Sequence, residues 1–181
     1  MKTLVLVFHP DVSASRVNRR WAEEMEKQDN VTVQRVYEVY PDEQIDVAAE
    51  QRLLEQHDRI VLQFPFYWYS TPSLLKKWED AVLTYGWAFG SEGDKLHGKE
   101  LLIAVSVGAP EENYSSNGAF KYTVQELLRP LQATSNLIGT RYLTPFIVHG
   151  AARMPDDQIE LSVKEYVAYA LKPGIAPLAD R

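Results

Sequence analysis

Short apolar segments alternate with longer amphipathic segments along almost the whole chain. The short segments are rich in valine, leucine and isoleucine, and they predict β-strands at residues 3–8, 31–36, 59–64, 100–107 and 141–148. The longer segments repeat apolar residues at helical spacing, and they predict helices at residues 14–27, 47–57, 73–83, 120–131 and 156–171. This alternation of strand and helix is typical of a doubly wound α/β fold.

The segment at residues 59–64 is apolar without polar alternation, which indicates a strand buried on both faces of a parallel sheet. We therefore expect a three-layer α/β/α sandwich with a five-stranded parallel sheet in the order 2-1-3-4-5. In that order the loops after the first, third and fourth strands, at residues 9–18, 65–71 and 106–114, meet in one crevice. Ligands of such sheets bind at the carboxyl ends of the strands.

Length and composition narrow the class of protein. A chain of 181 residues is long enough for one well-buried domain, and we expect a single domain over residues 1–181. The absence of cysteine excludes disulfides and thiolate chemistry. A net charge of −6 argues against nucleic acid as a partner. No apolar run approaches the roughly 20 residues of a membrane span, and the N-terminus lacks a signal-peptide pattern, so we expect a cytoplasmic protein.

The first of the three loops has the polar groups of a phosphate site. Ser13, Ser15 and Asn18 can add side-chain donors to the free amides at the start of the following helix, and His9 can add an imidazole N–H. The alternative is that Ser15 only caps the helix and His9 only ends the strand. The loop lacks the glycines of a Walker loop or of a dinucleotide fingerprint, which disfavours ATP hydrolysis and Rossmann-type binding.

The second loop is unusually aromatic. Prolines at positions 65 and 72 enclose the run Phe66, Tyr67, Trp68, Tyr69. Adjacent rings at the exit of a buried strand lie where a planar ligand would bind, and the alternative is that they are core or interface aromatics. Phe66, Trp68 and Tyr69 cannot all point into one core, so we expect some of these rings at the ligand.

The third loop follows the fourth strand at Ser106, Val107, Gly108 and Ala109, where a glycine allows the backbone to approach a ligand closely. The alternative is a plain turn. Elsewhere we expect no metal site, because three histidines have no partner at ligand spacing and are interpreted as structural or solvent-exposed: His57, His97 and His149. No motif of nucleophilic catalysis is present.

Taken together, these segments resemble the flavodoxin-like NAD(P)H:quinone oxidoreductases. The resemblance rests on His9-Pro10 with Ser15 and Asn18, on the segment from Gln63 to Trp78, and on the loop at residues 85–90. Within that family the chain is most similar to bacterial general-stress NAD(P)H oxidoreductases and to the ancillary proteins of Kef potassium-efflux systems. The resemblance implies a flavodoxin-like fold and a bound flavin, FMN or FAD.

The resemblance also implies which residues hold the flavin. Its phosphate would lie at His9, Ser15, Val17 and Asn18, its isoalloxazine ring at Pro65, Phe66, Tyr67, Trp68 and Tyr69, and its pyrimidine side at Ser106, Val107, Gly108 and Ala109. Tyr114 stands where related enzymes carry a tyrosine that helps to stabilise the reduced flavin. The histidine that they place six residues later is Phe120 here. We expect FMN, because 181 residues show no segment for an adenylate half.

The function implied is two-electron transfer from NAD(P)H through FMN to a quinone. The family also implies a homodimer, with Trp68, Tyr69 and the loop at residues 87–89 near a shared active-site mouth. One alternative is a regulatory subunit that contacts a membrane potassium-efflux protein and uses flavin as a redox sensor. A second alternative is an azo- or nitro-compound reductase.

Overall fold

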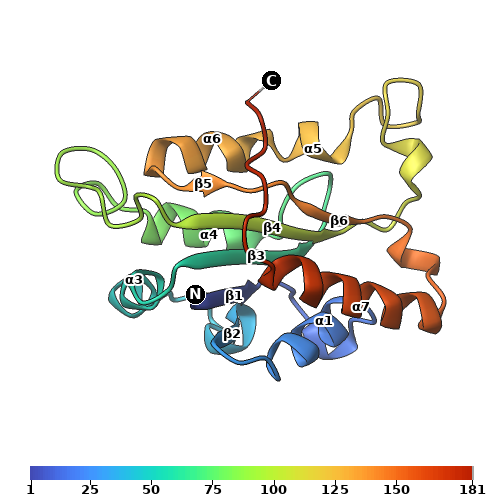
Figure 1. The fold of residues 1–181 in the computed structure, drawn as a ribbon, viewed down its shortest axis with the longest axis horizontal. Helices are drawn as coiled ribbons and strands as arrows, with labels where there is room; N and C mark the ends of the chain where they lie inside the picture. Colours follow the sequence, from blue (N-terminus) through green and yellow to red (C-terminus); the bar gives the residue numbers. More distant parts are fainter. Residues whose placement is uncertain (181) are drawn as a thin grey trace.

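The computed structural model describes residues 1–180, which form three layers with a parallel sheet in the middle (Figure 1). The strand order β2-β1-β3-β4-β5 confirms the expected topology, and a sixth strand, β6, also pairs with β4. The strands are β1 (Thr3–Val7), β2 (Val31–Arg35), β3 (Arg59–Pro65), β4 (Glu100–Ser106), β5 (Arg141–Tyr142) and β6 (Phe146–Val148). Their carboxyl ends point to the same edge of the sheet, because every pairing is parallel.

Helices cover both faces of the sheet. The helices are α1 (Asn18–Met25), α2 (Val36–Val39), α3 (Val47–Glu55), α4 (Ser73–Val82), α5 (Val124–Leu127), α6 (Arg129–Ile138) and α7 (Asp156–Leu171), and single 3₁₀ turns lie at Val12–Ala14, Glu111–Asn113 and Ala151–Arg153. In β1, Leu4 and Leu6 face one apolar layer, and Val5 and Val7 face the other. The expectation of strands buried on both faces is therefore confirmed.

Two of the elements predicted after β4 in the chain differ from those in the structure. The helix expected at residues 120–131 is two helices, because a capping box at Thr123 and Glu126 starts α5 and Pro130 opens α6. The strand expected at residues 141–148 is interrupted, because Thr144 leaves the sheet and donates its N–H to Ala176 C=O of the C-terminal segment. Figure 1 shows that segment running across β4 and the link between β5 and β6, where Leu178 N–H donates to Tyr142 C=O.

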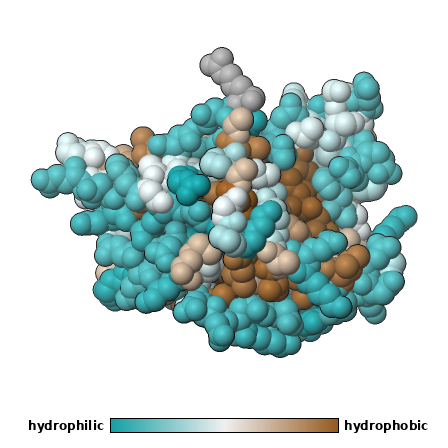
Figure 2. Space-filling model, viewed as in Figure 1, coloured by the Kyte–Doolittle hydropathy of each residue, from teal (hydrophilic) through white to brown (hydrophobic). Residues whose placement is uncertain are grey.

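The first helix also begins later than predicted. Residues 14–17 form the end of a 3₁₀ turn and a short extended link, and α1 begins at Asn18. The link keeps more of the first loop irregular at the carboxyl end of β1. Figure 2 shows the face of the molecule that carries α7. Hydrophobic residues are exposed near the centre of this face, and hydrophilic residues surround them.

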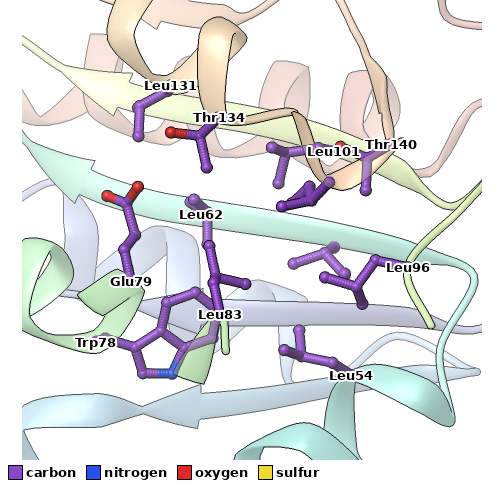
Figure 3. Close-up of a pocket in the computed structure, with 12 residues that line it drawn as sticks. Leu54, Leu62, Trp78, Glu79, Leu83, Leu96, Leu101, Leu131, Thr134 and Thr140 are labelled. Atoms are coloured by element: carbon purple, nitrogen blue, oxygen red, sulfur yellow. The ribbon is translucent and has the colours of Figure 1, made fainter. Parts of the chain in front are cut away.

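A small apolar cavity lies between α4 and α6, on the face of the sheet opposite α7 (Figure 3). Its volume is about 30 Å³, and its lining is Leu54, Ile60, Leu62, Trp78, Glu79, Leu83, Leu96, Leu101, Leu131, Thr134, Ile138 and Thr140. Glu79 is the one ionisable group in this lining, and its carboxylate points toward Leu131 and Thr134 (Figure 3). Burial raises the pKa of Glu79 from 4.5 to about 7.

Candidate functional site

The three predicted loops meet in one crevice of about 330 Å³ at the carboxyl ends of the strands. The crevice is lined by His9, Ser15, Arg16, Val17, Asn18, Pro65, Phe66, Ser106, Gly108, Ala151 and Ala152. The expected convergence of the loops after β1, β3 and β4 is thus present in the structure. The turn after β6 supplies the remaining wall.

Asn18 connects the three walls of the crevice. Its side chain is buried, its Nδ2 donates to Ser106 Oγ at 2.9 Å, and its Oδ1 accepts from Gln63 Nε2 at 3.2 Å. The Asn18 N–H donates to Ser15 Oγ at 3.0 Å, and Gln63 Oε1 accepts from the Tyr166 hydroxyl at 3.1 Å. A single amide therefore holds the first loop against β3 and β4, and Gln63 extends this network to α7.

The first loop presents hydrogen-bond donors to the crevice. His9 Nδ1 accepts the Asp11 N–H at 3.0 Å, so the neutral ring carries its proton on Nε2 and can donate from there. Partial burial lowers the pKa of His9, against the opposing effect of Asp11, and this favours the neutral ring. The Ser15 hydroxyl accepts from Asn18, which leaves its hydrogen for a ligand. The amides that open α1 add further donors.

Arg16 is the one cation in the crevice lining, and the sequence-based site did not include it. Its Nη2 donates to Met154 C=O at 2.9 Å and pairs with Asp156 at 2.7 Å, so it links the first loop to the start of α7. The pair is exposed, and such pairs contribute little to stability. A dianionic ligand in the crevice could therefore recruit this guanidinium at small cost.

The aromatic loop is a tight hairpin with strained backbone. Tyr67 and Ser70 exchange hydrogen bonds of 3.0 and 3.1 Å, and the two residues between them, Trp68 and Tyr69, have φ of +50° and +61°. Bulky side chains rarely adopt this left-handed conformation, which concentrates at functional sites. Trp68 is 92% exposed. The hairpin, which follows the lining residue Phe66, thus holds an indole in solvent.

An aromatic cluster around Tyr114 lies next to the crevice. The Tyr114 ring is 6.3 Å from Phe66, 4.9 Å from Phe120 and 5.8 Å from His149, between ring centroids. Phe120 also contacts Tyr69 at 5.0 Å. Burial raises the pKa of Tyr114, so its hydroxyl stays protonated and can donate a hydrogen bond.

The structure brings most of the predicted site residues into the crevice wall, although not all. The predicted residues that line it are His9, Ser15, Val17, Asn18, Pro65, Phe66, Ser106 and Gly108. The predicted residues outside this lining are Tyr67, Trp68, Tyr69, Val107, Ala109 and Tyr114. Tyr67, Trp68 and Tyr69 follow the lining residue Phe66 directly along the chain, Tyr114 contacts Phe66, and Val107 is fully buried. A role in cofactor binding or catalysis stays a prediction for all of these residues, inside and outside the lining.

A family model of the flavodoxin-like fold matches residues 1–170. The chain is 57% identical to general stress protein 14 of Bacillus subtilis, over 97% of this chain and 100% of that protein. It is 48% identical to the uncharacterized NAD(P)H oxidoreductase YrkL of the same organism, over 93% of this chain and 97% of that protein. The chain belongs to the flavodoxin-like NAD(P)H oxidoreductase family.

More distant relatives connect this family to particular ligands and partners. A crystal structure of general stress protein 14 from Treponema denticola in complex with FMN has a TM-score of 0.89 and 44% identity, covering 94% of this chain and 98% of that one. An NADPH-quinone reductase from P. pentosaceus has a TM-score of 0.88 and 37% identity, covering 96% and 100%. The potassium-efflux ancillary protein KefF of Salmonella typhimurium is 41% identical, over 90% of this chain and 92% of that protein.

Residues 1–180 contain neither a membrane-spanning helix nor a cluster of metal-binding side chains. None of their helices is long and apolar enough to cross a membrane. No group of three or more histidine, aspartate or glutamate side chains among them is arranged to hold a metal ion.

Proposed function

We propose that this protein binds FMN in the crevice and passes two electrons from NAD(P)H to quinones. The observation that carries the proposal is the convergence of the three loops, with the residues expected from the sequence, on one crevice at the carboxyl ends of β1, β3 and β4. The FMN complex of a relative that is 44% identical over nearly the whole chain supports the choice of cofactor.

The residues at the crevice fit FMN. His9 Nε2, the Ser15 hydroxyl and the amides at the start of α1 are donors for the phosphate, and Arg16 adds a positive charge beside them. Pro65 and Phe66 offer an apolar surface for the ring system, and Gly108 leaves room for its edge. When bound, FMN supplies the two-electron chemistry, and the chain supplies binding and orientation.

The nicotinamide donor and the acceptor would both react with the flavin held in this crevice, so they are expected to occupy it in turn. Denaturation should release FMN, identified by chromatography, and steady-state rates with NAD(P)H and a quinone should give parallel reciprocal plots, because the first product leaves before the acceptor enters. Intersecting plots would contradict a shared site. A protein that binds no flavin, even after reconstitution with FMN or FAD, would contradict the whole proposal.

We propose further that the protein is a homodimer, with the exposed indole of Trp68 covered by the partner. In one protomer the loop at residues 85–99 lies at the amino ends of the strands, since Lys99 bonds to the carbonyls of Glu55 and His57. That loop can therefore approach the crevice only from the partner subunit. Sedimentation of wild type should give a dimer, and Trp68→Ala should weaken dimerisation at least tenfold; a monomeric wild type would refute the assembly.

The alternative as a potassium-efflux ancillary subunit is favoured by the 41% identity to KefF. An ancillary subunit would keep the same crevice, so turnover alone does not separate the two functions. Co-fractionation with membranes from cells that contain the efflux protein, and not from cells that lack it, would support this alternative. The second alternative, reduction of azo or nitro compounds, differs from quinone reduction only in the electron acceptor. Turnover rates with each acceptor would distinguish these activities.

A further inference from the structure

Arg16 stands between the crevice and a second pocket. This α1–α7 pocket has a volume of about 370 Å³ and is lined by Arg16, Arg19, Arg20, Asp156, Ile159 and Glu160. Arg16 is the one residue common to both linings. Its Nη2 donates to Met154 C=O at 2.9 Å and to Asp156 Oδ1 at 2.7 Å. The boundary between the two spaces is therefore a side chain of the first loop that is held by the start of α7.

The guanidinium of Arg16 keeps hydrogen-bond donors for a ligand. An arginine side chain carries five N–H donors, and both of its bonds here come from Nη2. Within residues 1–180, Nε and Nη1 have no hydrogen-bond partner. Arg16 directly follows Ser15, whose hydroxyl is a donor for the phosphate in the proposed FMN site. Arg16 can therefore bind a phosphate in the crevice while it stays bonded to Asp156.

The α1–α7 pocket does not suit a second phosphate. Arg20 donates from Nε and Nη2 to the two carboxylate oxygens of Glu160, at 2.7 and 2.9 Å, and from Nη1 to Glu23 at 2.9 Å. Arg19 donates to Glu23 at 2.8 Å. Both arginines are thus bonded to carboxylates already. The Asp156 side chain is 94% exposed, so an anion that passed Arg16 would meet this carboxylate next.

FMN and FAD differ at the atoms that would reach this boundary. The phosphate of FMN is a monoester, and a phosphate monoester carries a charge of about −1.5 to −2 near neutral pH. In FAD the same phosphate is linked to a second phosphate and an adenosine, so it has one terminal oxygen fewer and a smaller charge. A monoester therefore gains more from the free N–H groups of Arg16, and only the dinucleotide needs a path past the guanidinium.

We propose that Arg16, held in place by Asp156, selects the flavin mononucleotide over the dinucleotide by closing the crevice at the phosphate. This inference rests on the proposed function, and it makes Arg16 a specificity-determining residue for the cofactor. FMN leaves the bridge between the first loop and α7 intact. FAD must break the bridge, and its second phosphate then lies beside the Asp156 carboxylate.

The test is the dissociation constant of each flavin, measured by fluorescence titration of the flavin-free protein with FMN and with FAD. We expect wild type to bind FMN about 100-fold more tightly than FAD. Arg16→Ala removes donors that a monoester uses best, so its affinity for FMN should fall about tenfold or more. Its affinity for FAD should change by less than about threefold, because the loss of a charge and the opening of the crevice oppose each other.

Asp156→Asn separates the bridge from the charge of Arg16. This variant keeps the guanidinium but removes the carboxylate that holds it and that faces a second phosphate. Its affinity for FAD should rise about tenfold, whereas its affinity for FMN should stay within about twofold of wild type. The control is Arg52→Ala, because Arg52 is an exposed arginine on α3 that lines neither space. It should keep both wild-type affinities.

Both substituted side chains are largely exposed, so both variants should fold, and urea unfolding of the flavin-free proteins checks this. Equal affinities of wild type for FMN and FAD overturn the inference and leave the proposed function standing. So does a variant, Arg16→Ala or Asp156→Asn, that keeps the full wild-type preference for FMN, including one in which both affinities change by the same factor. A wild-type protein that binds neither flavin overturns the proposed function itself.

Discussion

Replacing Asn18 with alanine is expected to lower stability by about 1–3 kcal/mol and to weaken FMN binding about 10- to 100-fold. The variant removes the bonds from Asn18 Nδ2 to Ser106 and from Gln63 to Asn18 Oδ1, both of them buried. Ser106 Oγ then loses its buried donor, at about 1–3 kcal/mol, whereas Gln63 Nε2 keeps its bond to the Asn18 carbonyl and loses only its second acceptor. FMN must then order the loops that the amide orders in wild type, and each tenfold loss of affinity corresponds to about 1.4 kcal/mol.

Urea unfolding of the flavin-free protein and FMN titration by fluorescence measure the two effects separately. Asn136→Ala is a matched control, because Asn136 is exposed on α6 and its loss should change stability by no more than about 0.5 kcal/mol. Asn18→Ala and Ser106→Ala should be non-additive in stability, since the two side chains share a hydrogen bond. Wild-type stability together with weak FMN binding would show instead that Asn18 acts only as a phosphate donor.

The centre of the sheet could be predicted from the sequence because β1, β3 and β4 are buried on both faces. Runs such as residues 3–8 and 59–64 carry no polar alternation, and this pattern alone distinguishes a central parallel strand. The elements beyond β4 could not be predicted in the same way. Whether Thr144 continues a strand depends on the C-terminal segment that receives its N–H, and local sequence does not report that contact.

Site residues could be predicted where the local sequence is unusually polar or aromatic. They could not be predicted where a residue's partners lie far away in the chain. His9, Ser15 and Phe66 belong to polar or aromatic loops that stand out in the sequence. The predicted site does not include Gln63, which lies within an apolar strand. A single polar amide in such a strand was the available signal, because a buried amide needs hydrogen-bond partners, and these are provided by Asn18. Arg16 has no local signal, because its partners near the start of α7 lie 138 and 140 positions further along the chain.

The apolar cavity between α4 and α6 should make stability depend on pH through Glu79. Because burial raises the pKa of Glu79 in the folded protein to about 7, the unfolded chain loses this proton at lower pH than the folded chain does. Below its ordinary pKa of 4.5, Glu79 is protonated in both the folded and the unfolded chain, and its burial does not make stability depend on pH. As the pH rises through 7 the folded protein must bury a carboxylate, and the free energy of unfolding falls. Glu79→Gln should therefore match wild type near pH 4.5 and exceed it at pH 8.

The expected gain at pH 8 is about 2 kcal/mol. A shift from 4.5 to about 7 corresponds to about 3 kcal/mol, and the partial exposure of Glu79 reduces this value. Lys76 lowers and Asp80 raises the pKa of Glu79, whereas the cavity itself is apolar, so desolvation dominates. Glu165→Gln is the control, because Glu165 is exposed on α7, on the face of the sheet opposite the cavity. Urea denaturation at both pH values measures the difference, and an equal gain at pH 4.5 and pH 8 would attribute it to packing rather than to the buried charge.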